Sequence, residues 1–185
     1  MDILAPIFSA LGLISMILAS VIGGEKMKRI LVLVFLGNLF VGLSYIFDGT
    51  GINGAASCFL GAVQSVISYF FNVKHKPLPK WLVALYALSF VVVNVAVMGE
   101  ITVPAVINTS IAIVATLAFV MGIIQSKGFM YRFWTVMNML LWGVFDIVAK
   151  SYPALPTHVI LFVFTIAGMI IHDRKAIKEL KSGEK

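Results

Sequence analysis

Two aspartates recur in similar surroundings and are the first candidates for chemistry. They lie in the segments LSYIFDGTGINGAA and LWGVFDIVAKSYPA, where Asp48 and Asp146 each follow a phenylalanine. An acidic pair at one mouth of a protein could attract a cationic solute or take up a proton. Each residue also has an ordinary explanation: an Asp-Gly turn for Asp48, and an ion pair with Lys150, four residues on, for Asp146.

Asparagines interrupt several long apolar runs, and two of them stand at nearly corresponding distances from the repeated aspartates. These two are Asn38 and Asn138. As a functional pair they would hydrogen-bond a neutral solute near the middle of a membrane. As structural residues they would join neighbouring helices through hydrogen bonds worth about 0.6 kcal/mol on average. Both interpretations stay open from the sequence, whereas we assign Asn94 to helix packing.

A second set of polar and aromatic residues could line the same site. Gln64 and Ser68 share one helix face by their i,i+4 spacing. Asn108 begins a short polar group in a later apolar run. Trp134 and Trp142 lie on one face, so that an aromatic solute could stack there, or Trp142 could serve packing and Trp134 the membrane interface.

The elements that must position these side chains are apolar and long. The chain is 61% hydrophobic and 12% charged, with a mean hydropathy of +1.03, whereas soluble domains are roughly 45–50% apolar and about 25% charged. Its runs fit helices that cross a hydrocarbon core of roughly 30 Å, and they lack the alternation of barrel strands. We expect seven spans, at Ile3–Ile22, Ile30–Phe47, Gly54–Val73, Trp81–Met98, Thr102–Ile124, Phe129–Val148 and Thr157–Ile171.

The basic residues predict the orientation of these spans. With the N-terminus outside, the inner loops and tail hold all but Lys150 of the 14 Lys and Arg residues. Cytoplasmic loops of membrane proteins carry such an excess. The distribution therefore predicts an all-α integral membrane protein with seven transmembrane helices, N-out and C-in.

The repeated Phe-Asp pair also indicates an internal repeat, because the offset that relates the two pairs aligns Pro6 with Pro104. An odd number of helices with a repeat of three predicts two parallel three-helix units and one linker helix, as in SWEET-type transporters. The expected segments are the first repeat at 1–73, a basic loop and linker helix at 74–101, the second repeat at 102–172, and a charged cytoplasmic tail at 173–185.

Several function classes find no support in the sequence. The net charge of +6 does not indicate nucleic-acid binding, because the positive charges sit in short loops between apolar runs. The single cysteine, Cys58, cannot form an intrachain disulfide. The sequence has no His/Cys cluster with metal-ligand spacing, no nucleotide-binding loop and no catalytic constellation, so we expect no metal, no cofactor and no enzyme activity.

Three segments carry a resemblance to a known family: GLISMILASVIGGEKMKRIL, LSYIFDGTGINGAASCFLGAVQSVISYFF and VINTSIAIVATLAFVMGIIQSKGFMYRFWTVMNMLLWGVFDIVAKS. On them the chain resembles the YgjV-like family of bacterial inner-membrane proteins. The resemblance implies a multi-pass protein of that membrane, with a helix pattern similar to SWEET, PQ-loop and PnuC-like vitamin facilitators. The chain departs from these patterns in having Gly61 and Gln64 where YgjV-like proteins tend to carry Asn and Arg, and in lacking a Pro-Gln pair.

Three functions fit these features. The first is a facilitator or exchanger of a small polar solute, such as a vitamin, nucleoside or sugar, that works by alternating access. The second is a non-transporting partner or assembly protein whose basic tail contacts anionic lipid or another protein. The third is an enzyme acting on lipid, which would depend on Asp48, Asp146 and His158. We also expect copies of the chain to associate through small residues such as Gly37 and Gly42.

Overall fold

The computed structural model describes residues 3–22, 27–48, 52–96, 98, 100–148 and 155–174, and these residues form seven α-helices. The helices are α1 Leu4–Val21, α2 Met27–Asp48, α3 Ile52–Val73, α4 Lys80–Ala96, α5 Val103–Ile123, α6 Gly128–Val148 and α7 Leu155–His172. Each lies within one helical turn of a predicted apolar run. The prediction of an all-helical fold is therefore confirmed.

Five of the described helices, α1, α2, α3, α5 and α7, are long and apolar enough to cross a membrane. The apolar helix α4 is shorter, at 17 residues. The helix α6 has 21 residues, but its polar residues Arg132, Asn138 and Asp146 lower its hydropathy. Several spans in one chain make this a multi-pass membrane protein.

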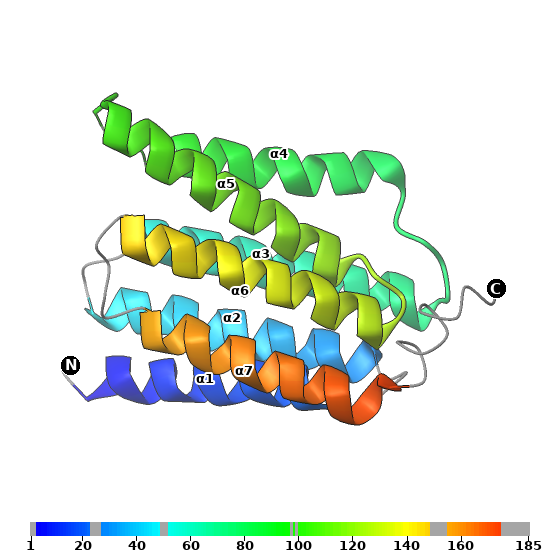
Figure 1. Ribbon diagram of the computed structural model, residues 1–185. Coiled ribbons are helices and arrows are strands. Elements are labelled where there is room, and N and C mark those ends of the chain that lie inside the picture. Colours follow the sequence, from blue (N-terminus) through cyan, green and yellow to red (C-terminus); the bar gives the residue numbers. More distant parts are fainter. Residues whose placement is uncertain are drawn as a thin grey trace.

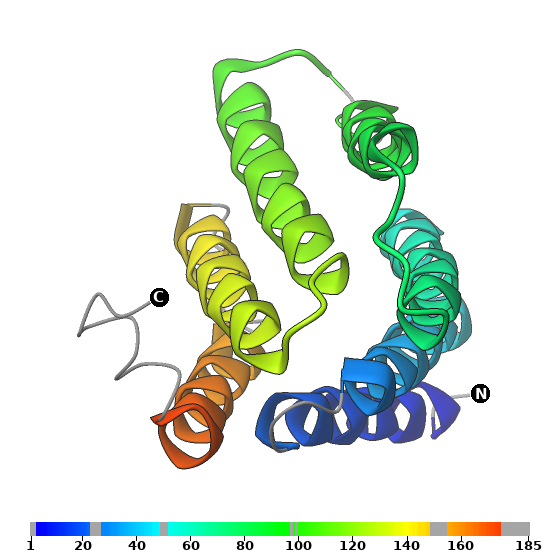
Figure 2. The ribbon, with the colours of Figure 1, turned by 90° about the vertical axis from the view of Figure 1, so that its right-hand side faces the viewer.

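The helices form a ring in which each packs against the next along the chain and α7 returns to α1 (Figure 1). Seen along the bundle, α1 to α4 form one arc and α5 to α7 another, and the two arcs meet where α1 contacts α7 and where α4 contacts α5 (Figure 2). Two sets of three helices can be distinguished, α1 to α3 and α5 to α7. In each set the middle helix, α2 or α6, packs against both of its neighbours.

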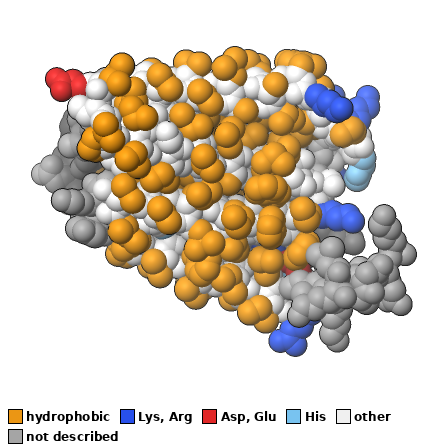
Figure 3. Space-filling view, turned by 45° about the horizontal axis from the view of Figure 1, so that its top comes forward, with side chains coloured by type: hydrophobic (Ala, Val, Ile, Leu, Met, Phe, Trp, Pro, Cys, Tyr) orange, Lys and Arg blue, Asp and Glu red, His pale blue; other side chains and the backbone are white. Residues whose placement is uncertain are grey.

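The surface of the bundle is apolar and much of its interior is polar, the reverse of a soluble protein. Large apolar side chains cover the face shown in Figure 3, and exposed examples such as Leu88, Val92 and Val163 are more than half accessible. Buried side chains include Gln64 and Asn138. A polar interior inside an apolar surface is stable where the surroundings are lipid rather than water.

Helix α6 shows this inversion along its whole length. Residues three or four apart share a helix face, and one face of α6 carries Arg132, Thr135, Asn138, Trp142 and Asp146. The opposite face carries exposed Phe133, Met137, Leu140, Val144 and Ile147. The helix therefore turns a polar stripe inward and an apolar stripe outward, as expected for a helix that faces lipid on one side.

The described Lys and Arg residues gather at one end of the bundle, which we call the basic end. The loops α3–α4 and α5–α6 and the ends of α1 and α7 lie there (Figure 1), and Lys and Arg show at that end of the surface in Figure 3. The apolar core lies mainly toward this end and includes Met27, Ile30, Leu31, Leu82, Tyr86, Ile123 and Tyr131.

Individual residues explain where α5 begins and where α3 ends. The Thr102 side chain accepts a hydrogen bond from the backbone N–H of Ala105, and Pro104 follows within the first turn of α5; both are typical helix starts. At the end of α3, His75 has a φ of 52°, and the N–H of Lys76 donates to the carbonyl of Phe71. This is a Schellman motif with histidine in the position that usually holds glycine.

The prediction that Gly37 and Gly42 are exposed is wrong, and association of copies of the chain stays a prediction. Both residues are buried. A Cβ atom on Gly37 would lie 2.7 Å from Cγ of Met16, and one on Gly42 would lie 3.2 Å from the ring of Phe59. These glycines let α1 and α3 approach α2 within the same chain, so they are not available to a second copy.

Candidate functional site

Four residues on α3 and α4 form a buried polar group, which we call the α3–α4 cluster: Gln64, Ser68, Tyr86 and Ser89. Nε2 of Gln64 donates to Oγ of Ser89 at 3.1 Å and to the backbone carbonyl of Tyr86 at 3.4 Å. The Tyr86 hydroxyl donates to the backbone carbonyl of Gln64 at 3.4 Å. The cluster therefore holds the two helices together through polar contacts.

Two atoms of this cluster have no hydrogen-bond partner among the described residues. They are Oε1 of Gln64 and Oγ of Ser68, although the Ser68 hydroxyl lies close to that of Tyr86, and both side chains are 1% exposed. The residues are one helical turn apart on the same face of α3. A buried polar group without a partner costs about 1–3 kcal/mol, so these atoms are suited to a molecule that supplies hydrogen-bonding groups.

Asn38 lies one helix away and faces α3. Its Nδ2 donates to the carbonyl of Val34 at 3.0 Å within α2. Its Oδ1 lies 3.2 Å from the place where a Cβ atom on Gly61 would stand, and the ring of Phe119 in α5 lies 3.4 Å from the same place. Only glycine fits without displacing neighbours here, so Gly61 is the point at which α2, α3 and α5 meet.

Asn138 joins α6 to α5, because its Nδ2 donates to the carbonyl of Ala115 at 2.7 Å. This contact matches the helix-packing interpretation of Asn138. Among the described residues no hydrogen bond joins Asn38 to Asn138, so each belongs to its own set of three helices in this conformer. Asn108 in α5 is partly buried, and its Oδ1 has no partner in the described part of the chain.

Asp146 pairs with His158 across α6 and α7, with 2.6 Å between its Oδ2 and Nδ1 of the histidine. The carboxylate side chain is 2% exposed and the histidine side chain 20%. Trp142 stacks on the imidazole, with ring centroids 5.9 Å apart and ring planes 14° apart. The stacking partner of Trp142 is thus His158. The predicted partner Lys150 and the side chain of Asp48 lie outside the described residues.

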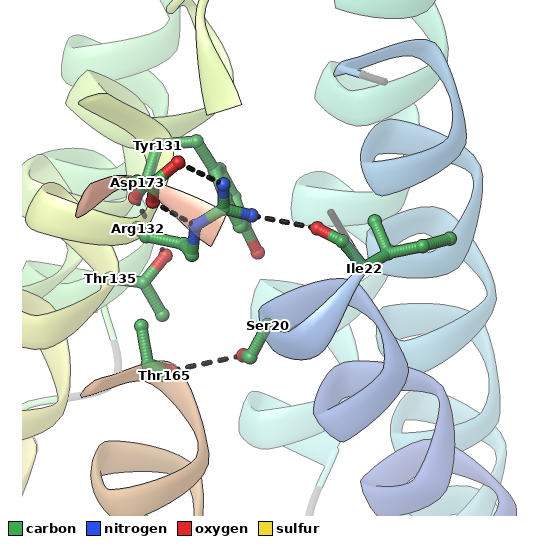
Figure 4. Close-up of polar contacts among 7 residues, drawn as sticks. All are labelled: Ser20, Ile22, Tyr131, Arg132, Thr135, Thr165 and Asp173. Carbon is green, nitrogen blue, oxygen red and sulfur yellow. Dashed lines mark hydrogen bonds and ion pairs between the residues drawn. The ribbon is translucent and has the colours of Figure 1, made fainter. Parts of the chain in front are cut away.

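Arg132 forms a polar lock at the basic end, and its side chain is fully buried. Its Nε and Nη2 donate to the two carboxylate oxygens of Asp173 at 2.6 Å and 2.7 Å, and its Nη1 donates to the carbonyl of Ile22 at 2.8 Å (Figure 4). Ile22 ends α1 and Asp173 follows α7, so one guanidinium binds both helix ends. We call these three residues the Arg132 lock.

A second contact closes the ring beside this lock. The hydroxyls of Thr165 in α7 and Ser20 in α1 lie 3.0 Å apart and are hydrogen-bonded (Figure 4). A Cβ atom on Gly168 would stand 2.2 Å from the carbonyl oxygen of Ser20. The absence of a side chain at Gly168 therefore lets the backbones of α1 and α7 touch.

Two grooves open on the outer surface of the bundle. One, of about 600 Å³, lies between α3 and α4 and is lined by apolar residues apart from Ser89. The other, of about 270 Å³, lies between α2 and α3. Phe59 and Val63 border both grooves. Their apolar walls suit acyl chains or apolar helix faces rather than a polar solute.

Sequence reasoning missed the two ion pairs. Arg132 was counted among the loop charges and Asp173 was assigned to the exposed tail, yet Asp173 is only 4% exposed. In the sequence, His158 is a candidate only for the alternative of an enzyme acting on lipid, together with Asp48 and Asp146. One signal was present for Arg132: it stands among aromatic residues in FMYRFW, inside an apolar run where a charge requires a partner. No comparable signal linked Asp146 to His158.

The described residues hold no group of three His, Cys, Asp or Glu side chains that could bind a metal ion. Function must therefore be argued from the polar clusters of this chain. Comparisons of the chain with protein-family models, with curated proteins and with solved structures give no match.

Proposed function

We propose that this protein is a facilitator or exchanger of a small polar solute in the bacterial inner membrane. In this proposal all seven helices span the membrane, with the N-terminus outside and the basic end in the cytoplasm. The helices α1 to α3 and α5 to α7 are parallel repeats, and α4 is the linker. The solute class is a vitamin, a nucleoside or a sugar, all of which offer several hydrogen-bonding groups.

The proposal rests on two buried polar side-chain atoms of α3 that have no hydrogen-bond partner among the described residues. Oε1 of Gln64 and Oγ of Ser68 are buried in a membrane protein without partners in the described residues. A polar atom that serves only helix packing is expected to find a partner. A solute hydroxyl or amine could donate to Gln64, and Ser68 can donate or accept. We therefore place the solute beside these two residues.

Other predicted site residues extend this site along the bundle. Asn38 lies beside α3 at Gly61, and Asn138 and Trp142 lie on the inward stripe of α6. Asn108 has an unpaired Oδ1 in α5. In the proposed transporter these side chains offer the solute successive hydrogen bonds between the two membrane faces, and Asp48 and Asp146 stand at the mouth opposite the basic end.

The Arg132 lock fits a transporter that is closed on the cytoplasmic side. It joins α1, in the first set of three helices, to α6 and α7, in the second set. Alternating access requires the two sets to separate at one end while they stay in contact at the other. Opening toward the cytoplasm would break the bond from Arg132 to Ile22, whereas the pair with Asp173 could move with α6 and α7.

The test is ligand-dependent thermal stability of the purified protein in detergent, with a panel of nucleosides, vitamins, sugars and amines. A ligand that binds only the folded protein raises its stability by mass action. The Gln64→Met variant should lose this shift. The change removes a buried unpaired oxygen but also the bonds from Nε2 to Ser89 and Tyr86, so the thermal unfolding of the ligand-free variant is measured alongside to show that it folds.

Gln125→Met is the matched control. Gln125 donates to the carbonyl of Met121 within its own turn and lies at the basic end, away from the α3–α4 cluster. This variant should keep the ligand shift. A shift that persists in Gln64→Met would refute the proposed position of the solute, and no shift with any member of the panel would count against transport of these solutes.

A non-transporting partner protein is the second candidate. The apolar grooves beside α3 favour it, because a helix of another membrane protein could fill such a groove. In that case Val63→Trp, which would place a bulky ring where the two grooves adjoin, should disrupt a native complex detected by cross-linking. The transporter proposal expects this variant to keep the ligand shift.

A further inference from the structure

We propose that Asp146 and His158 form the proton-binding site of this protein, loaded from the end opposite the basic end. The proposal rests on the proposed transport function for its purpose, but the binding of the proton can be measured without it. In the transporter, protonation of this pair would couple solute movement to proton entry.

In the proposed site Asp146 is ionised, and this assigns the hydrogen atoms. An ionised carboxylate only accepts hydrogen bonds, so Nδ1 of His158 carries the hydrogen that Asp146 receives across 2.6 Å. The other ring nitrogen, Nε2, is then the basic one. Proton uptake adds a hydrogen at Nε2 and converts a neutral imidazole and a carboxylate into an imidazolium–carboxylate ion pair.

Two neighbours contact the imidazole ring. The carboxylate of Asp146 is nearly free of solvent, at 2% exposure, so its charge acts on the imidazolium without much screening. The face of Trp142 lies 5.9 Å from the ring centre, within the range of a cation–π contact. Histidine is also the side chain that ordinarily changes charge near neutral pH.

The difference in exposure between the two side chains indicates from which side a proton reaches the pair. His158 is 20% exposed, whereas Asp146 is buried, so the histidine connects the carboxylate to the aqueous side. Among the described residues, the titratable groups near the pair on other helices are Tyr45 of α2, on which Asp146 acts electrostatically, and Cys58 of α3 beside it. Protonation changes the net charge of the Asp146–His158 pair itself from −1 to zero.

This change of charge provides the means of coupling. A buried net charge opposes any movement of its helix through the membrane interior, and a neutral ion pair opposes it less. Asp146 is on α6 and His158 on α7, the two helices that the Arg132 lock holds to α1 at the other end. Proton uptake would therefore favour rearrangement of the helices that control access at the basic end.

Tryptophan fluorescence tests the proposal, because a protonated imidazole in contact with an indole quenches its emission. The test protein carries Trp81→Phe and Trp134→Phe, which leaves Trp142 as the only tryptophan. Its emission should fall when the solution is acidified, because a histidine side chain gains a positive charge on protonation. His158→Gln should abolish this change, and His172→Gln, which removes an exposed histidine at the basic end, should leave it intact.

Asp146→Asn keeps the size of the side chain and tests the role of the carboxylate. Without the negative charge the imidazolium is less stable, so the midpoint of the fluorescence change should move to lower pH. A flat emission curve, a curve that persists in His158→Gln, or a midpoint unmoved in Asp146→Asn would each overturn the proposal. Since Asp146→Asn tests the pair independently, failure of His158→Gln to fold does not prevent a decision.

The two proposals fail in distinguishable ways. An absent fluorescence titration together with an intact ligand-induced stability shift would refute the proton site and leave the solute site standing. An intact titration without any ligand-induced shift would refute the proposed solute site and leave the proton site standing.

Discussion

At the scale of single residues, and among the residues that the structure describes, the buried charged side chains Arg132, Asp146 and Asp173 are paired, and each pair connects two helices. Asp173 follows the C-terminus of α7, where the helix dipole disfavours a negative charge. Arg132 offsets that charge with two hydrogen bonds and also satisfies the terminal carbonyl of α1 at Ile22. Buried ion pairs contribute little net stability because both charges lose their hydration. Their value here lies in specifying which helix ends meet.

Removal of one charged member of the Arg132 lock should therefore lower the free energy of unfolding far more than removal of both charges. Asp173→Asn leaves the guanidinium of Arg132 buried without its counter-charge, which should cost about 3–5 kcal/mol. The double variant Arg132→Met/Asp173→Leu removes both charges and should recover most of that loss. Chemical unfolding in detergent measures both effects.

Arg174→Ala is the control for the lock. Arg174 is the next residue along the chain, but it is exposed and donates only to the carbonyl of Ile170. Its removal should change the free energy of unfolding by less than about 0.5 kcal/mol. If Asp173→Asn were equally mild, the buried contact between Arg132 and Asp173 would not exist in the folded protein.

At the scale of helices, close contacts depend on residues without side chains. Gly12 and Gly37 let α1 and α2 approach each other, and Gly168 lets α7 touch α1 at Ser20. Small residues are the usual means of close helix contact in membranes, because lipid provides no hydrophobic force that drives helices together. The contact of α1 with α7 is the one that closes the ring, so its loss should affect the whole bundle.

Gly168→Ala should separate α1 from α7. The new Cβ atom would lie 2.2 Å from the backbone oxygen of Ser20, and backbone cannot move aside as a side chain tip can. We expect a loss of about 1–3 kcal/mol, as for other overpacked sites. Gly143→Ala in α6 is the matched control, since its Cβ would meet only Leu155 Cδ1 at 3.9 Å.

The control should be neutral or stabilising, because alanine favours a helix by about 1 kcal/mol over glycine. Thermal unfolding of the two variants side by side measures the difference. Equal stability of Gly168→Ala and Gly143→Ala would contradict the packing of α7 on α1 at Ser20.

At the scale of the whole molecule, the gathered positive charges predict how the bundle sits in a membrane. The described Lys and Arg residues lie at the basic end, and the exposed Glu100 lies in the α4–α5 segment at the other end. Cytoplasmic loops attract Lys and Arg. The basic end should therefore face the cytoplasm.

Cysteine accessibility tests this orientation in a Cys58→Ala background. Lys76→Cys lies at the basic end and Glu100→Cys at the opposite end, and both native residues are exposed. A membrane-impermeant maleimide added to spheroplasts should label Glu100→Cys directly and Lys76→Cys only after permeabilisation. The reverse pattern would invert the orientation, and equal labelling of both sites from outside would mean that α4 does not cross the membrane.

The number, type and approximate bounds of the helices could be predicted from the amino-acid sequence alone. Long apolar runs can satisfy their backbone groups in lipid only as helices, and breakers such as KHKPLPK separate them. It also placed Asn38, Gln64 and Asn138 within the helices, and all three are buried. These conclusions depend on local composition alone.

Which polar side chains contact each other depends on how the helices pack, and it could be seen only in the three-dimensional structure. Asp146 pairs with His158 twelve residues away, and Arg132 with Asp173 forty-one residues away. Helix α2 is apolar nearly all round and gives no periodic signal of which face turns inward, whereas the polar stripe of α6 indicates its inward face but not the partners of its side chains. That choice depends on helix packing, where glycines such as Gly61 and Gly168 set how closely two backbones approach. The sequence could propose Asn38 and Asn138 as a pair, but the rotation of α2 and α6 about their axes decided that each bonds elsewhere.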